Sequence, residues 1–332
     1  MNDTGLLGPW VRRFLLEHLA GDRNLSPNTQ KSYRDMLVQL LPFVAKKSGK
    51  TVDRLLVMDL SAAAVRQFLN HLELNRRCGI STRNQRLGGI HALAKFISEN
   101  RPEYVSWAGE IRQVPSKKFT APAITCLDRS EMNALLEAPN RSTVRGRREH
   151  ALLLFLYNSG SRASEAAALT IADIDWHARS VQILGKGKKL RSCPLWSVTL
   201  KPLRPLTAGR DGAERIFLNR LFQPLTRSGI HAIVKRLAEQ ARRTAPSLAN
   251  KSIGPHVIRH STASHLLRAG VDLNTIRAWL GHVSINTTNI YAEIDLDTKA
   301  RALAACIPTT RRVRSSASWR SRPALMEFLR TL

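Results

Sequence analysis

Cysteine is scarce in this chain of 332 residues. Its four cysteines, Cys78, Cys126, Cys193 and Cys306, are scattered, and no two of them form a Cys-x-x-Cys pair. This distribution predicts neither a disulfide framework nor a zinc site. The cysteine usage therefore indicates a reduced, intracellular protein, for which we expect a cytoplasmic location and no bound metal.

Long apolar runs are also absent. The longest, from Ala151 to Tyr157, is far too short to span a bilayer, and the first residues lack the charged-then-apolar order of a signal peptide. Aromatic residues make up only 6% of the chain, which argues against binding single-stranded nucleic acid by base stacking. We expect a soluble protein without a membrane partner.

Acidic residues are few. Lys and Arg number 52 against 25 Asp and Glu, which leaves a net charge of +27. Such an excess favours a polyanionic partner, nucleic acid above all, over a merely solvated basic surface. Residues 1–112 carry +7 and the rest of the chain +20, so the stronger attraction is expected in the C-terminal two-thirds. The carboxylates form no cluster suited to Mg²⁺, and the spacing of a P-loop is missing.

The first 112 residues show helical periodicity. Ser26 can cap a helix that has Pro27 in its first turn, and Asp59–Ser61 and Ser81–Thr82 open two more helices. Apolar residues recur at helical spacing after each start. A small helical domain of four or five helices over residues 1–112 is therefore predicted.

Periodicity fades from Glu103 to Ala123, where prolines and lysines intervene, and we place a basic linker at residues 113–125. A second domain, residues 126–308, is predicted to combine helices with one β-hairpin, and a basic tail with a short helix follows at 309–332. The fold class is thus mainly α with a small β-hairpin or sheet. Its expected strands are Ser180–Leu184 and Leu190–Pro194, and its expected later helices are Ile230–Arg242, Pro255–Ala269, Leu273–Leu280 and Ile285–Ala292.

Four residues near the C-terminal end can act together on a phosphodiester. His256 and Arg259 are three positions apart at an expected helix start, hence on one face. His282 follows Gly281, which can end a helix in the left-handed conformation, and Tyr291 comes nine positions after His282. Cationic and imidazole donors can hold the non-bridging oxygens while the phenol attacks phosphorus.

Two further cations lie upstream. Arg162 follows a small-residue turn and precedes a helix, where its guanidinium can bind a phosphate bidentately although its charge opposes the helix dipole. Glu165 could hold that guanidinium or simply cap the helix. Lys186, flanked by Gly185 and Gly187 at the hairpin tip, could protonate a leaving oxygen, although solvated lysines are commoner at such tips.

A structural role is the alternative for two residues of this region, His260 and Tyr291. His260, beside Arg259, fits a hydrogen-bonded core histidine better than a catalytic one. Taken alone, Tyr291 would more often be a partly buried tyrosine whose hydroxyl finds a partner. The nine-residue interval after the Leu-Gly-His run favours the functional interpretation of this tyrosine.

The combined pattern resembles the tyrosine recombinase (phage integrase) family, including its Xer members. His265-Leu266-Leu267 after the His-x-x-Arg-His start resembles one of the family's motifs, and the stretch from Phe14 to about Ile97 resembles its helical core-binding domain. Ser161 replaces a leucine that is common before the first arginine. The positions that match the family's activating residues and its nucleophile are Arg162, Lys186, His256, Arg259, His282 and Tyr291.

This resemblance implies a site-specific recombinase of a mobile element or Xer-like system, in which two domains form a C-shaped clamp around double-stranded DNA. Tyr291 would form a 3′-phosphotyrosyl link, while Lys186 protonates the leaving oxygen and His256 assists. Because the link conserves the energy of the broken bond, no ATP, metal or other cofactor is implied. The implied assembly on two duplexes is a homotetramer, or a heterotetramer with related recombinases.

Two other functions stay open at this stage. A type IB topoisomerase-like nickase would use the same chemistry without exchange between duplexes. A catalytically silent DNA-binding regulator would keep only the basic surface. The helical first domain and the Leu-Gly-His run favour recombination over both.

Overall fold

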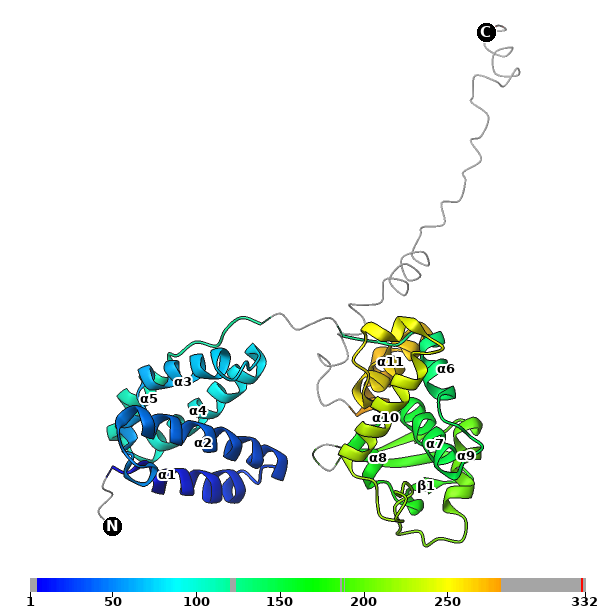
Figure 1. The fold of residues 1–332 in the computed structure, drawn as a ribbon, viewed down its shortest axis with the longest axis horizontal. Coiled ribbons are helices and arrows are strands. Elements are labelled where there is room, and N and C mark those ends of the chain that lie inside the picture. The colour runs from blue at the N-terminus through cyan, green and yellow to red at the C-terminus, as the bar shows by residue number, and fades with distance from the viewer. Residues whose placement is uncertain (1–4, 120–123, 186, 188, 282–329, 331–332) are drawn as a thin grey trace. The chain divides into compact units, whose positions relative to one another are not determined.

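The computed structural model describes residues 5–119, 124–185, 187, 189–281 and 330. The chain divides into two compact units, Met1–Pro122 and Ala123–Leu332. Both units are mainly helical, and the second also contains a small sheet (Figure 1). The predicted fold class is therefore confirmed. None of the described helices is long and apolar enough to cross a membrane.

The first unit is a set of helices around one apolar core. Ser26 caps its helix as predicted, because its Oγ accepts a hydrogen bond from the Thr29 backbone N–H at 3.3 Å, and Ser61 accepts one from Ala64 at 3.2 Å. The helices are α1 (Leu7–Arg13), which continues into a π-helical stretch (Phe14–Asp22), α2 (Pro27–Ser48), α3 (Ala62–Leu74), α4 (Ile80–Asn100) and α5 (Val105–Arg112).

Two details of the first unit differ from the sequence-based expectation. Helix α4 begins at Ile80, ahead of Ser81–Thr82, and its N-cap is Gly79. Helix α5 occupies part of the stretch where periodicity fades. Trp107 is buried there and its indole N–H donates to the carbonyl oxygen of Leu60 at 2.9 Å. A helix of eight residues with three buried positions shows too few repeats for its period to be detected.

The second unit packs helices around an antiparallel sheet of order β1-β2-β3. Strands β2 (Ser180–Leu184) and β3 (Leu190–Pro194) have the predicted bounds, and a short β1 (Ile174–Asp175) extends the sheet. The helices are α6 (Arg129–Glu137), α7 (Val144–Ser159), α8 (Ala163–Ala168), α9 (Ser197–Thr207), α10 (Arg227–Ala241), α11 (Pro255–Arg268) and α12 (Leu273–Leu280).

The later helices also follow the sequence pattern. Helix α12 has the predicted bounds, and α10 and α11 differ from theirs by at most three residues. Helix α9 was not predicted, because Pro202 and Pro205 lie inside it and the sequence there lacks a helical signal. The expected helix Ile285–Ala292 lies outside the described residues.

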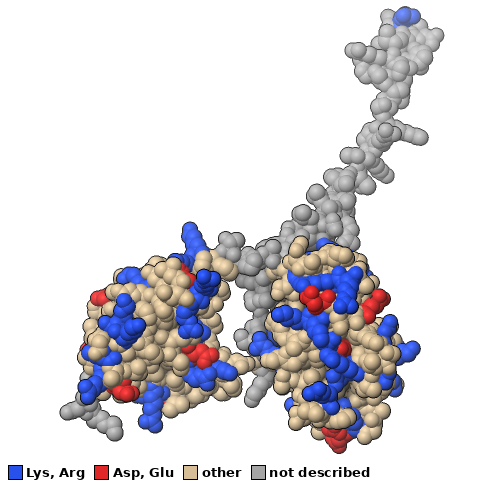
Figure 2. All heavy atoms as spheres, in the orientation of Figure 1, with Lys and Arg blue, Asp and Glu red and all other residues tan. Residues whose placement is uncertain are grey.

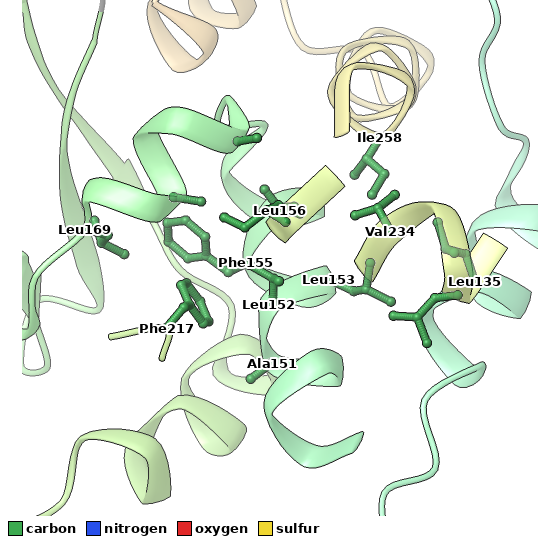
Figure 3. Packing of buried hydrophobic residues seen from close by; sticks show 14 of the residues in the cluster. Leu135, Ala151, Leu152, Leu153, Phe155, Leu156, Leu169, Phe217, Val234 and Ile258 are labelled. Carbon is green, nitrogen blue, oxygen red and sulfur yellow. The ribbon is translucent and has the colours of Figure 1, made fainter. Parts of the chain in front are cut away.

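Helix α7 is the centre of the second unit's core. The ring centroids of Phe155 and Phe217 are 5.7 Å apart. Figure 3 shows Leu153 of α7 close to Val234 of α10 and Leu135 of α6. Because α7 is surrounded by these partners, the residues that follow it directly are held in place at the edge of a rigid core.

Candidate active site

Arg259 links three segments of the second unit that are far apart in the sequence. It lies in α11 and is only 3% exposed. Its Nη1 donates a hydrogen bond to the carbonyl oxygen of Gly160 at 2.6 Å, and its Nη2 donates one to that of Leu280 at 2.7 Å. The buried guanidinium therefore fixes the C-terminal ends of α7 and α12 against the first turns of α11.

Gly160 makes this close approach possible. It ends α7 in the left-handed conformation, with φ 57° and ψ 24°. A Cβ atom at this position would lie 2.4 Å from Cδ2 of Leu280. Any side chain would thus have to displace the Leu280 side chain, which is fully buried, and would strain the left-handed turn that leads into Arg162.

Arg162 is held by Glu165, as the sequence suggested. Arg162 Nη1 lies 2.7 Å from Glu165 Oε1, and the Arg162 backbone N–H donates to Glu165 Oε2 at 3.0 Å. The two alternatives for Glu165, ion pair and helix cap, are therefore both realised. Burial raises the pKa of the Glu165 carboxyl, but hydrogen bonds and charges from Arg191 and then Arg162 outweigh it and lower the pKa below its ordinary value. Glu165 is consequently a carboxylate at neutral pH.

His256 is exposed at the start of α11, near the two arginines. Desolvation, and then the charges of Arg259, His231, Arg227 and Arg162, lower the pKa of this histidine. The imidazole is therefore neutral near pH 7 and can accept a proton. The structure thus brings together three of the six residues that the sequence singled out.

The polar face of α11 docks on α7, and this accounts for the other histidines. His265 Nδ1 and the Tyr157 hydroxyl are 2.7 Å apart, and Thr262 donates to the carbonyl oxygen of Tyr157 at 2.8 Å. His260 is half-buried, and desolvation followed by the charges of His256 and Arg259 lowers its pKa to about 4. This partial burial suits the structural role that the sequence favoured for His260.

Lys186, His282 and Tyr291 lie outside the described residues. The residues that directly precede Lys186 and His282 in the chain are described. Gly185 closes the hairpin by donating its backbone N–H to the Lys189 carbonyl oxygen at 2.8 Å. Gly281 ends α12 in the left-handed conformation, with φ 67°, as predicted. The segments that lead to Lys186 and His282 are thereby placed on the same unit as Arg162 and Arg259.

Sequence reasoning missed Arg191, which contacts both Glu165 and the end of α12. Its Nη2 lies 2.7 Å from Glu165 Oε2, and its Nε donates to the Trp279 carbonyl oxygen at 2.9 Å. A signal existed in the hairpin. Arg191 is two residues before the buried Cys193, so both point to the core face of β3. An arginine at a core-facing strand position needs a buried partner.

Asn158 was also missed, and it joins the end of α7 to β3. Its Nδ2 donates to the Pro194 carbonyl oxygen at 3.0 Å, and its Oδ1 accepts from the Trp196 backbone N–H at 2.8 Å. Its carbonyl oxygen accepts from the Trp279 indole at 3.1 Å. No sequence pattern marks such a residue, because its partners are 36 or more positions away.

The visible surface of each unit is basic. In Figure 2, Lys and Arg side chains outnumber acidic ones on the visible faces of both units. In the part of the chain that the structure describes, no group of three or more His, Cys, Asp or Glu residues is placed to hold a metal ion. The site's cations are side chains, and they suit a phosphate-containing ligand.

Two family descriptions match this chain. The model of the phage integrase family matches residues 125–297, and that of the phage integrase N-terminal SAM-like domain matches residues 12–100. The chain belongs to the phage integrase family. Tyrosine recombinases of this family cleave and rejoin DNA strands. The expected family resemblance is confirmed for both units.

Full-length relatives agree with this assignment. The chain is 35% identical over 335 residues to "Putative integrase/recombinase y4rC" of Sinorhizobium fredii, covering 100% of both chains. It is 30% identical over 296 residues to the tyrosine recombinase XerC of Pelobacter propionicus, covering 86% of this chain and 91% of the relative.

Solved structures share the fold of this phage integrase family member. The Tn1549 transposon integrase, solved with transposon right end DNA, matches with a TM-score of 0.69 at 15% identity and covers 89% of this chain and 99% of that one. The XerH recombinase, solved bound to difH, matches with a TM-score of 0.62 at 21% identity and covers 87% and 82%.

Proposed function

We propose that this protein is a site-specific DNA recombinase that cuts and rejoins double-stranded DNA through a 3′-phosphotyrosyl intermediate on Tyr291. The contact of Arg259 with Gly160 and Leu280 carries the proposal. One buried guanidinium binds both Gly160, which is two residues before Arg162, and Leu280, which is two residues before His282. The segments that lead to Arg162 and to His282 therefore lie close together. Such a cluster of fixed cations suits the charge that develops on a phosphorane-like transition state.

The proposed chemistry balances without an outside reagent. The Tyr291 oxygen forms a bond to phosphorus, and the bond from phosphorus to the 5′-oxygen breaks. Lys186 gives a proton to that oxygen, which leaves as a hydroxyl. His256, neutral near pH 7, can take the tyrosine proton. Attack by a partner strand's 5′-hydroxyl then reverses the step and restores a phosphodiester.

The DNA substrate is found first in cells. DNA that stays joined to the protein after SDS denaturation is recovered and sequenced, and the site is rebuilt as a duplex with a nick beside the cleavage position. The short fragment released there diffuses away and traps the covalent intermediate. We expect wild-type protein to form an SDS-resistant adduct with this substrate in excess EDTA.

Tyr291→Phe is the decisive variant. We expect it to bind the rebuilt site with an affinity like that of the wild type and to form no adduct, because phenylalanine has no oxygen to attack with. Tyr33→Phe is the control and should form the adduct normally. An adduct from Tyr291→Phe would contradict the proposal, and so would a wild-type reaction that requires Mg²⁺.

Strand exchange separates recombination from simple nicking and closing. Two duplexes that carry the site and different flanking lengths are mixed with the protein. Products with exchanged flanks are expected from a recombinase, whereas a topoisomerase-like enzyme would only relax supercoiled DNA. A four-protomer assembly on two duplexes belongs to the same proposal, and the basic surface of both units supports the contact with DNA that it requires.

A further inference from the structure

Arg191 is a buried arginine that touches several segments of the candidate active site. Its side chain in β3 is 8% exposed. It forms an ion pair with Glu165 through Nη2 at 2.7 Å, and its Nε donates to the Trp279 carbonyl oxygen at 2.9 Å. A guanidinium suits this double contact because its donors form a rigid, planar fork.

The ion pair with Glu165 changes the charge that Arg162 presents. One carboxylate, 5% exposed, faces two guanidinium groups, those of Arg162 and Arg191, each at 2.7 Å. The group of three carries a net charge of +1. With Arg162 and Glu165 alone the net charge would be zero, and Arg162 would offer a weaker field to an anion.

Arg191 also lies against the two glycines that precede Lys186 and His282 in the chain. A Cβ atom on Gly185 would lie 3.2 Å from Arg191 Nη1, and one on Gly281 would lie 3.1 Å from Arg191 Cδ. Because Arg191 binds the Trp279 carbonyl, its positive charge lies at the C-terminal end of α12, where the helix dipole favours a cation. One side chain therefore contacts the hairpin tip, the Arg162 ion pair and the end of α12.

We propose that Arg191 is a positioning residue for DNA cleavage, which orients Arg162 through Glu165, keeps their group of three net positive, and holds the end of α12 through Trp279. The proposal rests on the proposed recombinase function. Arg191 touches no substrate in this role, so its loss should slow strand cleavage and spare DNA binding.

The second unit offers a matched control. Glu149, 3% exposed, also faces two arginines, Arg145 at 2.8 Å and Arg236 at 2.6 Å. This second group lies at the start of α7 and in α10, and none of the six predicted site residues belongs to it. Arg191→Met and Arg236→Met therefore each leave a buried carboxylate with one arginine partner instead of two. Only Arg191→Met does so beside the candidate site.

The test measures adduct formation on the nicked duplex at saturating protein, DNA affinity and melting temperature. We expect Arg191→Met to slow adduct formation about 10- to 100-fold, the loss typical of a charge-assisted hydrogen bond, with affinity changed less than about threefold. Arg236→Met, whose side chain is 35% exposed, should lower the melting temperature by no more than Arg191→Met does and react at nearly the wild-type rate. Arg191→Lys, which keeps the charge but not the fork, should be intermediate.

A double variant tests whether Arg191 acts through Arg162. If it does, combining Arg191→Met with Arg162→Lys should slow cleavage by much less than the product of the two single effects. Independent, multiplying effects would overturn the inference, and so would wild-type cleavage by Arg191→Met or an equal loss in Arg236→Met. No adduct from the wild type would instead refute the proposed function and the inference with it.

Discussion

At the scale of single residues, two glycines with nearly the same backbone conformation have very different surroundings. Gly49 ends α2 with φ 65° and ψ 23°, and Gly160 ends α7 with φ 57° and ψ 24°. A Cβ atom on Gly49 would meet nothing within 4 Å, whereas one on Gly160 would lie 2.4 Å from Leu280. The pair separates the backbone cost of a substitution from the cost of a steric clash.

We expect Gly49→Ala to lower the free energy of unfolding by about 1 kcal/mol, the cost of a left-handed alanine. Gly160→Ala should lower it by about 2–4 kcal/mol, because overpacking adds to that cost. It should also slow adduct formation, since it displaces the carbonyls that Arg259 holds. Calorimetry of both variants measures the two losses of unfolding free energy. Equal losses would contradict the expected clash, because they would show that Leu280 moves aside without a loss of stability.

At the scale of elements, α11 carries three histidines, His256, His260 and His265, whose pKa values are all lowered by desolvation first of all. Each is therefore neutral in the folded protein at neutral pH, and protonation favours the unfolded chain. For a histidine with a depressed pKa, the unfolded state binds the proton first as pH falls. Stability is then lost as pH drops below about 6.5.

His260 gives the clearest case, because its pKa is lowered to about 4. We expect the wild type to lose up to about 3 kcal/mol more stability than His260→Gln between pH 6.5 and pH 4. Denaturant titrations across this range provide the measurement. Parallel curves for the wild type and His260→Gln would contradict the lowered pKa.

The elements also differ in how far local sequence determined them. Strands β2 and β3 and helix α12 matched the expected bounds because each has a short local signal: alternation with a glycine turn for the hairpin, and Gly281 for the helix end. Helix α9 escaped detection because its two prolines oppose a helix locally, while burial of Leu200 and Leu203 stabilises one. Tertiary packing there outweighs local propensity.

At the scale of the whole molecule, we propose that the basic C-terminal tail takes part in assembly on DNA. Six of its last 24 residues are arginines, and Ala324 to Leu329 forms a short amphipathic sequence; nearly all of this stretch lies outside the described residues. Such a segment on a basic tether is suited to binding a groove on a neighbouring protomer. Folding back on its own unit is the alternative.

Deleting residues 323–332 distinguishes docking on a neighbouring protomer from folding back on the same unit. If the tail joins protomers, the truncated protein should bind one site and cleave a nicked half-site almost normally, while pairing of two duplexes should fall at least about tenfold. Gel shifts and strand-exchange assays measure these steps. Leu325→Ala with Phe328→Ala should reproduce the deletion, and Glu327→Ala should not. Strand exchange at the full-length rate would show that protomers engage elsewhere.

Within the candidate site, the sequence alone determined which residue types occur at which intervals. It placed His256 and Arg259 on one helical face and Glu165 within reach of Arg162, because both relations span a single helical turn. It also indicated the basic surface and the family. Relations of this kind depend only on neighbours in the chain.

Only the tertiary structure decided what the arginines do. The hydrogen bonds of Arg259 reach 99 and 21 positions along the chain, and that of Arg191 to Trp279 reaches 88. These partners meet because α7, α11, α12 and β3 pack around one core, and no local interval encodes such a meeting. A buried guanidinium must find acceptors wherever the fold supplies them. The groups that Arg259 and Arg191 bind are therefore visible only once the chain is folded.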